Sequence, residues 1–449
     1  MHTEKTEENS RRNFLKGAVS AAALGAMGTG FILNACSRDR LDVEEPAFLD
    51  KAPDGRLLKA GLIGCGHRGT GAAFNFLNAG TNLEITALGD VFGDRLERCR
   101  QQLREHRNVE VADEKCFIGF DAYEKVIDSG VDVVLLAAPP YFRPSHFDAA
   151  VRARKHVFME KNVAVDPVGA RAIMASSRMA DSIGLKVVTG TQRRHQRDYL
   201  TAYEYIKAGA IGDIVSANCY WNQQQLWHVK PQPGWTEMEA MLRNWINWCW
   251  LAGDHIVEQH IHNIDVVIWF KNALPTKALS FGSRQRRITG DHYDFFSTDF
   301  VFEDGSHLHS MCRQINGCSN NVSEHITGTK GTSDCKSYIR DDNGNMLWQY
   351  PYSEQGYDDG GVMTGRVSVS PYDQEIINLI TAIRNDTPLN EAETCAKSTL
   401  AGIMGRMSAY TGKEVTWEEV MNSNLRLGPE KLTFGDVGIK AIIPVPGIA

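Results

Sequence analysis

The chain has 449 residues, 43% hydrophobic and 23% charged, as expected for a globular protein of two or three domains. Its 48 Lys and Arg residues against 55 Asp and Glu residues give a net charge of −7, and no basic stripe is present, which argues against nucleic acid as a partner. The ten cysteines are scattered without a CxxC pair or zinc-ligand spacing, so we expect buried thiols rather than a disulfide framework.

The first 36 residues have the pattern of an export signal. Residues 10–16 read S-R-R-N-F-L-K, as in twin-arginine signals, and a weakly apolar stretch rich in Ala and Gly follows. Leu33-Asn34-Ala35-Cys36 resembles a lipobox, and cleavage before Cys36 would leave a lipidated cysteine that attaches the protein to a membrane. Because Asn34 is unusual there, cleavage without lipidation stays open. We therefore predict a periplasmic protein or a membrane-anchored lipoprotein, with residues 37–56 as a polar linker.

A dinucleotide-binding turn follows the linker. Residues 57–63 (LLKAGLI) predict a strand, and G-C-G-H-R-G comes directly after it, before a helical pattern. In a G-x-G-x-x-G the first glycine allows the tight turn, the second lets the backbone approach a pyrophosphate, and the third lets helix pack on strand. The helix N-terminus offers N–H groups to the phosphates. The residues of this motif that we predict to bind cofactor are Gly64, Gly66, His67, Arg68 and Gly69.

An acidic residue closes the second predicted strand, which covers residues 83–88. Asp90 follows the motif by about 20 residues, where a carboxylate can hold both hydroxyls of a ribose. Its charge would repel a 2′-phosphate, so the sequence favours NAD over NADP. The alternative is a glycine-rich turn that binds no nucleotide.

The alternation of strands and helices continues, with strands predicted at residues 131–138, 156–159 and 187–190. Ligands bind beyond the carboxyl ends of parallel strands, so the residues that follow these strands are expected at the cofactor. They are Pro139, His146, Glu160 and Lys161. We predict an α/β protein with a Rossmann domain over residues 57–190 and a substrate and oligomerisation domain over residues 191–449.

The order of these motifs resembles the Gfo/Idh/MocA oxidoreductases, which include glucose–fructose oxidoreductase and inositol dehydrogenase. The shared features are GxGxxG, the acid after the second strand, A-A-P-P followed by His, and K-H-V-F-M-E-K-N, where Asn162 replaces the proline usual in the family. The resemblance covers residues 57–420. It implies a C-terminal α/β domain with a large open, mostly antiparallel sheet, which often mediates dimers, so we expect a homo-oligomer, either dimer or tetramer.

The second signature of the family, D-x-G-x-H-x-x-D, matches E-Q-H-I-H-N-I-D at residues 258–265, where a Glu replaces the first Asp and His260 the Gly. The resemblance implies that a lysine and a histidine share the role of base for a substrate hydroxyl. It also implies that the first acid orients the histidine and that the second binds substrate or supports the histidine. The catalytic residues it implies are Lys161, Glu258, His262 and Asp265.

The histidines near this signature also suggest a metal site. His255, Glu258 and His262 fall on one face of a helix, at i, i+3 and i+7. However, H-x-x-E-x-H matches neither of the common zinc patterns, so we predict no metal.

Two further stretches allow two interpretations each. Six tryptophans between residues 221 and 250, with Asn and Gln among them, fit either a carbohydrate pocket or an aromatic core or interface. The run Q-R-R-H at residues 192–195 fits either a site for substrate or an acidic group, or a solvated charged surface.

Together these features predict an NAD-dependent oxidoreductase that transfers hydride between a nicotinamide cofactor and a carbohydrate, glycoside or polyol. The twin-arginine route exports folded proteins, and outside the cytoplasm there is no nicotinamide pool, so we expect a tightly bound, non-dissociating NAD. One alternative is an NAD-dependent glycoside hydrolase that uses transient C3 oxidation and elimination, which is redox-neutral. The second alternative is a non-catalytic sugar-binding protein.

Overall fold

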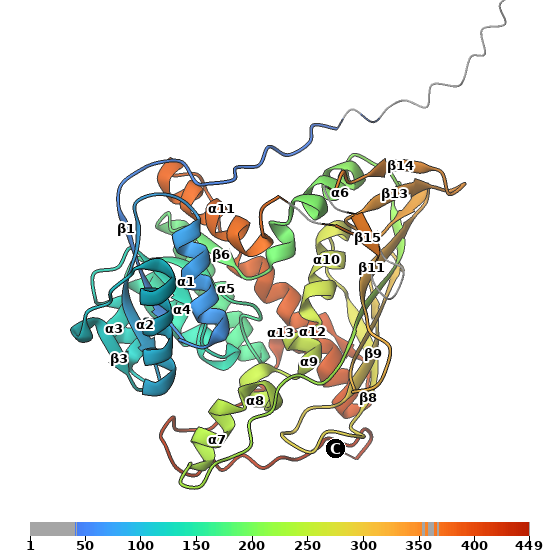
Figure 1. The fold of residues 1–449 in the computed structure, drawn as a ribbon. Coiled ribbons are helices and arrows are strands. Elements are labelled where there is room, and N and C mark those ends of the chain that lie inside the picture. Colours follow the sequence, from blue (N-terminus) through green and yellow to red (C-terminus); the bar gives the residue numbers. More distant parts are fainter. Residues whose placement is uncertain (1–40, 42, 353–354, 358–362, 366–367, 449) are drawn as a thin grey trace, which may run out of the picture. The chain divides into compact units, whose positions relative to one another are not determined.

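The computed structural model describes residues 41, 43–352, 355–357, 363–365 and 368–448 (Figure 1). The predicted export signal, including Cys36, lies outside the described residues. Residues 43–449 form one compact unit. Part of the predicted linker thus belongs to this unit, where the Ala52 N–H donates to the Ala79 carbonyl at 2.7 Å and Asp50 pairs with Arg197 at 2.6 Å. No described helix is long and apolar enough to cross a membrane.

The N-terminal half is a six-stranded, wholly parallel sheet with strand order β3-β2-β1-β4-β5-β6. Its strands are β1 (Leu58–Ile63), β2 (Leu83–Asp90), β3 (Cys116–Ile118), β4 (Val133–Leu136), β5 (His156–Met159) and β6 (Val187–Thr189). Its helices are α1 (His67–Asn78), α2 (Gly93–Arg107), α3 (Ala122–Ile127), α4 (Arg143–Arg152) and α5 (Pro167–Ser182), with short 3-10 turns η1 (Asp113–Lys115), η2 (Pro140–Phe142) and η3 (Gln192–Arg194).

Both faces of this sheet are covered, as the unbroken apolar pattern of its central strand requires. Along β4, Val133 and Leu135 pack into one apolar cluster, whereas Val134 and Leu136 pack into the other. Helices α3, α4 and α5 close the second cluster, and α1 and α2 close the first. A helix from near the end of the chain, α11 (Pro371–Asn385), also covers the first cluster and lies beside α1 (Figure 1).

The C-terminal half contains a nine-stranded sheet of order β14-β13-β12-β11-β7-β10-β9-β8-β17, in which only β7 and β10 pair in parallel. Its strands are β7 (Ile214–Gln223), β8 (Lys277–Ser283), β9 (Phe295–Val301), β10 (His307–Gln314), β11 (Asn321–Gly328), β12 (Gly331–Ser333), β13 (Tyr338–Asp341), β14 (Met346–Gln349) and β17 (Val415–Thr416). Strands β15 (Gln355–Tyr357) and β16 (Met363–Gly365) pair antiparallel as a separate two-stranded sheet. The predicted combination of a Rossmann sheet with a large, mostly antiparallel sheet is confirmed.

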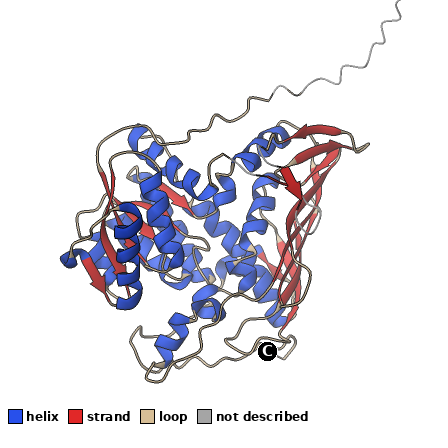
Figure 2. Cartoon of the chain, viewed as in Figure 1, coloured by secondary structure: helices blue, strands red, loops and turns tan. Residues whose placement is uncertain are grey.

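Helices fill the space between the two sheets (Figure 2). They are α6 (Arg197–Lys207), α7 (Glu237–Arg243), α8 (Cys249–Ala252), α9 (His255–Glu258), α10 (Ile261–Lys271), α12 (Ala392–Thr411) and α13 (Trp417–Asn422), with the 3-10 turn η4 (Trp245–Asn247). The long helix α12 packs on α5, α9, α10 and β8. Its buried Arg406 donates to the Val165 and Gly253 carbonyls, each at 2.8 Å. This contact fixes the start of α9, which carries Glu258, relative to the segment that follows β5, which carries Lys161.

Candidate functional site

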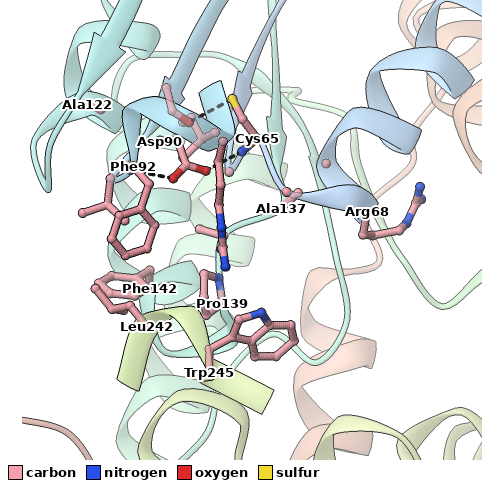
Figure 3. A pocket seen from close by; sticks show the side chains of 18 of the residues that line it. Cys65, Arg68, Asp90, Phe92, Ala122, Ala137, Pro139, Phe142, Leu242 and Trp245 are labelled. Carbon is pink, nitrogen blue, oxygen red and sulfur yellow. Dashed lines mark hydrogen bonds between the residues drawn. The ribbon is translucent and has the colours of Figure 1, made fainter. Parts of the chain in front are cut away.

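A cavity of about 570 Å³ lies at the carboxyl ends of the parallel strands (Figure 3). The glycine loop, the ends of β2 and β4, and the start of α2 line one side of it. Side chains from residues 227–245, which belong to the C-terminal half, line the other side. The cavity is therefore enclosed by both halves of the molecule.

The three glycines of the loop are needed for different reasons. Gly64 has φ +97°, and a Cβ there would meet the Ala138 amide nitrogen at 2.5 Å. A Cβ on Gly69 would lie 1.8 Å from the Gly64 carbonyl oxygen, so α1 can approach the loop only with glycine. A Cβ on Gly66 would meet nothing within 4 Å. The first and third glycines thus serve the packing of the chain, whereas Gly66 borders open space that suits a closely approaching pyrophosphate.

Asp90 lines the cavity with its carboxylate fixed by backbone N–H groups. One oxygen accepts from Cys65 in the glycine loop at 2.7 Å, and the other accepts from Phe92 at 2.8 Å (Figure 3). Burial raises the pKa of Asp90. Arg95 and Arg98 of α2 line the same region. The loop, the N-terminus of α1 and this carboxylate fit the pyrophosphate and ribose of a dinucleotide.

The other predicted cofactor residues divide into two groups. His67, Arg68, Pro139 and His146 line the cavity, whereas Glu160 and Lys161 do not. The Arg68 guanidinium is shared between two buried carboxylates, Glu160 at 2.5 Å and Glu375 at 3.1 Å. The Glu160 carboxylate is therefore engaged by protein.

His146 is buried beside the cavity and stacks on Tyr123, with ring centroids 4.2 Å apart. Burial lowers the pKa of His146 to about 3, and the nearby Arg143 charge acts in the same direction. The imidazole is therefore neutral at physiological pH.

Lys161 lies two residues beyond β5, and its side chain is 11% exposed. Its Nζ donates to the Glu258 carboxylate at 3.0 Å and to the Glu258 main-chain carbonyl. The peptide between Lys161 and Asn162 is cis, although Asn162 stands where the family has proline. The Asn162 amide donates to the Ala164 and Ala252 carbonyls, at 2.7 and 3.1 Å, and Arg143 donates to the Asn162 carbonyl. The turn that carries Lys161 is thus held from both halves of the molecule.

His262 lies in the same region and stacks on the indole of Trp221, with ring centroids 5.3 Å apart. Burial lowers the pKa of His262 well below its ordinary value, and the charges of Lys161 and Arg193 lower it further. The imidazole is neutral, so it can accept or donate a hydrogen bond to a substrate hydroxyl.

The two predicted acids make contacts different from those expected. Glu258 bonds to Lys161 and to the Gln259 side chain, and among the described residues it makes no hydrogen bond to His262. Asp265 forms a two-pronged ion pair with Arg194 at 2.8 and 2.9 Å and accepts from Ser398 at 2.6 Å. Both Asp265 oxygens are engaged away from Lys161, and the catalytic role implied for this residue stays a prediction.

The histidines considered for a metal site have separate partners. His255 Nδ1 lies 2.9 Å from Asp254, and His260 Nε2 lies 2.7 Å from the Ser310 hydroxyl. In the part of the chain that the structure describes, no three His, Cys, Asp or Glu side chains come together as metal ligands.

The Q-R-R-H run is not a solvated charged surface. Its three basic side chains are largely buried, and each pairs with a carboxylate from the C-terminal half. The pairs are Arg193 with Glu324, Arg194 with Asp265, and His195 with Glu391 at 3.0 Å. The partner carboxylates are far away in the sequence, so no local sequence pattern predicts these ion pairs. The run joins the end of the Rossmann sheet to the C-terminal half.

The tryptophans of residues 221–250 lie in three different parts of the structure rather than in one. Trp221 stacks on His262, Trp250 is buried against Tyr141, and Trp227 and Trp245 line the nucleotide cavity. The sequence interpretation missed this last contribution. The only signal for it is the aromatic density of the stretch, because the wall forms through tertiary packing.

Comparisons with known proteins agree with this geometry. Residues 58–188 match the model of an oxidoreductase family with an NAD-binding Rossmann fold, and residues 199–334 match the Gfo/Idh/MocA C-terminal domain. Residues 8–28 match the twin-arginine translocation signal sequence, which supports export by that route.

Two curated relatives are similar over part of the chain. A myo-inositol 2-dehydrogenase of Thermotoga maritima is 30% identical over 155 residues, which cover 34% of this chain and 42% of the relative. A 2,7-anhydro-N-acetylneuraminate hydratase of Escherichia coli is 24% identical over 287 residues, covering 62% of this chain and 67% of the relative. The chain thus spans less than half of the first relative and about two thirds of the second.

Two solved structures share the fold. One is scyllo-inositol dehydrogenase of Lactobacillus casei with NAD(H) and scyllo-inositol, at a TM-score of 0.57 and 20% identity, covering 80% of this chain and 99% of that one. The other is aldose-aldose oxidoreductase of Caulobacter crescentus, at a TM-score of 0.59 and 17% identity, covering 80% and 100%. With both of its domains matched by models of one family, the chain belongs to the Gfo/Idh/MocA oxidoreductases.

Proposed function

We propose that the protein is an NAD-dependent oxidoreductase acting on a CH–OH group of a carbohydrate, glycoside or polyol. The observation that carries this proposal is the position of the Lys161–Glu258 pair. Leu136 of β4 pairs with Met159 of β5, so these two neighbouring strands end side by side. The residues that follow β4 line the cavity, and Lys161 follows β5. A proton-accepting pair therefore lies next to the nucleotide cavity.

The side chains have complementary roles in this proposal. In its free-amine form Lys161 takes the proton of the substrate hydroxyl on Nζ, and the Glu258 carboxylate, 3.0 Å away, accepts the hydrogen bond of the resulting ammonium. The neutral His262 binds the same hydroxyl and positions it. The nicotinamide cofactor, when bound, supplies the hydride acceptor.

Unpaired polar atoms of Trp221, which stacks on His262, and of two glutamines support the proposed substrate class. Trp221 Nε1, Gln223 Nε2 and Gln192 Oε1 are buried and have no hydrogen-bond partner within the described structure. Trp221 and Gln223 are two residues apart on β7 and so lie on the same face of the sheet. Gln192 directly precedes Arg193, whose guanidinium lies 5.5 Å from the Trp221 ring. Such donors and an acceptor suit a polyhydroxylated ring. The inositol dehydrogenase relatives act on molecules of this kind.

We further propose that NAD, rather than NADP, is the cofactor and that it does not dissociate during turnover, so that a carbonyl compound must take the hydride back from the reduced nicotinamide after each oxidation. Asp90 supports NAD by its charge, and export to a compartment without nicotinamide supports retention. Extraction of washed protein, followed by mass spectrometry, tests both points. We expect about one NAD per chain, and an empty protein would contradict retention.

The decisive experiment is reduction of the bound cofactor by a panel of cyclitols, aldoses and glycosides, read by the absorbance of the reduced nicotinamide. We expect reduction by at least one polyol and formation of the matching keto product. Binding of a sugar without reduction would contradict the proposal and favour a binding protein.

A redox-neutral glycosidase is the second candidate, and the hydratase relative favours it, because a hydratase adds water without net oxidation. Incubation with aryl glycosides and NAD separates the two. Free aglycone without net NADH supports the glycosidase, whereas a keto-sugar supports the dehydrogenase.

The location and assembly follow as proposals. We expect the mature protein in the periplasm, with a lipid on Cys36, and labelling with a radioactive fatty acid in wild-type and Cys36→Ser cells tests the anchor. We expect a dimer or tetramer formed through the open face of the large sheet, where Phe281 is 69% and Met311 41% exposed. Light scattering of Phe281→Asp against wild type tests the interface.

A further inference from the structure

The side of the nucleotide cavity that faces the glycine loop is formed by a segment outside the Rossmann domain. We call residues 227–245 the clasp. Its side chains that line the cavity are Trp227, Val229, Leu242, Arg243 and Trp245. Leu242 and Trp245 lie across the cavity from Cys65 and Asp90 (Figure 3).

The clasp is braced internally. The Asn244 side chain accepts from the Val229 N–H and donates to the Val229 carbonyl, both at 2.6 Å. Trp227 and Trp245 pack edge to face, with centroids 6.1 Å apart. These contacts join the two ends of the clasp to each other.

One ion pair joins the clasp to the element that carries Asp90. Arg243 binds both oxygens of Asp94, at 2.9 and 3.1 Å, and its guanidinium carbon lies 4.0 Å from the centre of the Phe92 ring. Asp94 stands in the first turn of α2, and Phe92 caps that helix, two residues beyond Asp90. The Arg243 hydrogen bond lowers the pKa of Asp94, so the pair is charged at neutral pH.

The C-terminal tail, which follows α13, contacts both the clasp and the Rossmann domain. Phe434 packs on Phe92 and Phe120, with centroids 6.1 and 5.4 Å away, and the Gly435 carbonyl accepts from the Met238 N–H at 3.0 Å. The tail, α7 and the start of α2 thus meet at one edge of the cavity.

We propose that the clasp retains the cofactor and that the Arg243–Asp94 ion pair is the latch that sets its release rate. This inference rests on the proposed function, because the retained ligand is the nicotinamide dinucleotide. A dinucleotide that occupies the cavity lies between the glycine loop and the clasp, so its departure requires the clasp to separate from α2. Separation breaks both Arg243–Asp94 hydrogen bonds and withdraws the guanidinium from Phe92.

The test measures release of NADH from the folded chain, without any substrate. Protein loaded with NADH is mixed with excess NAD, and the loss of protein-bound NADH fluorescence gives the dissociation rate. We expect Arg243→Gln and Asp94→Asn each to accelerate release about tenfold, since each removes the charge-assisted pair between the clasp and α2. Arg243→Gln also removes the contact with Glu239, which lies within the clasp. The double variant should be no faster than either single variant, because the two residues act as one unit. Arg243→Lys, which keeps the charge but loses the fork, should be intermediate.

Arg104→Gln is the matched control. Arg104 lies on the same helix and pairs with Glu110 at 3.0 Å, away from the cavity. Its release rate should equal that of wild type. Wild-type rates in both single latch variants, or multiplicative effects in the double variant, would overturn the latch alone. A wild-type chain that binds neither NADH nor NADPH would overturn the latch and the proposed cofactor together.

Discussion

The nucleotide cavity and the Lys161–Glu258 pair lie at the ends of neighbouring strands, yet they are assembled differently. The glycine loop and Asp90 come from one continuous βαβ unit, and the hydrogen bond that joins them, from Cys65 to Asp90, spans 25 residues. Lys161 and Glu258 come from different halves of the chain, 97 residues apart. The comparison teaches that the geometry of the glycine loop and Asp90 is largely a local property of this sequence, whereas the proposed proton-transfer pair depends on how the two halves pack.

The largest expected effect is the loss of turnover when the Lys161–Glu258 pair is broken. Lys161→Ala should lower turnover by about 10³-fold, because general acid–base catalysis of this kind contributes on that order. Its nucleotide affinity should stay within about twofold of wild type, because Lys161 does not line the cavity. Steady-state kinetics and titration with NADH check both. Loss of nucleotide binding in this variant would break the distinction between the two regions.

Asp265→Asn should mainly affect stability. It leaves the buried Arg194 guanidinium without its counter-charge, and removing one partner of a buried pair costs about 3–5 kcal/mol. Urea unfolding measures this, and Asp121→Asn, in the exposed pair with Lys125, is the control that should change little. A folded, stable Asp265→Asn protein that has lost its turnover would instead support the catalytic role implied by the family resemblance.

Substitution by alanine should affect stability at the outer glycines of the loop and nucleotide binding at the middle one. Gly69→Ala should destabilise the fold by about 3 kcal/mol, because the new Cβ meets the Gly64 carbonyl. Gly66→Ala should leave the unfolding free energy within about 0.5 kcal/mol of wild type, as a substitution into open space does, but weaken NADH binding. Thermal unfolding and fluorescence titration separate these outcomes. Equal effects of the two variants on binding and stability would contradict the assignment of Gly66 to the ligand.

The last prediction concerns how the free energy of unfolding depends on pH. The pKa of His146 is about 3 in the folded protein, against an ordinary value of 6.5. Between these values the unfolded chain binds a proton that the folded chain does not, so the free energy of unfolding falls as the pH decreases below about 6.5. The slope is about 1.4 kcal/mol per pH unit for one proton.

His146→Phe should remove that share of the pH dependence. The comparison uses cofactor-free wild type and variant in urea between pH 4 and 6, so that groups common to both cancel. Parallel pH profiles would show that His146 does not set this slope.

The sequence by itself determined the Rossmann unit, its glycine loop and the acid after the second strand, because their contacts are local and their side-chain pattern repeats with the sheet. It also placed Lys161 and His262 in motifs of one family. Tertiary structure decided that Glu258 binds Lys161 rather than His262, and that Asp265 forms an ion pair with Arg194. It also decided that the clasp closes the cavity through Arg243 and Asp94. Those contacts join residues far apart in the chain, and only the packing of helices between two sheets brings them within hydrogen-bond distance.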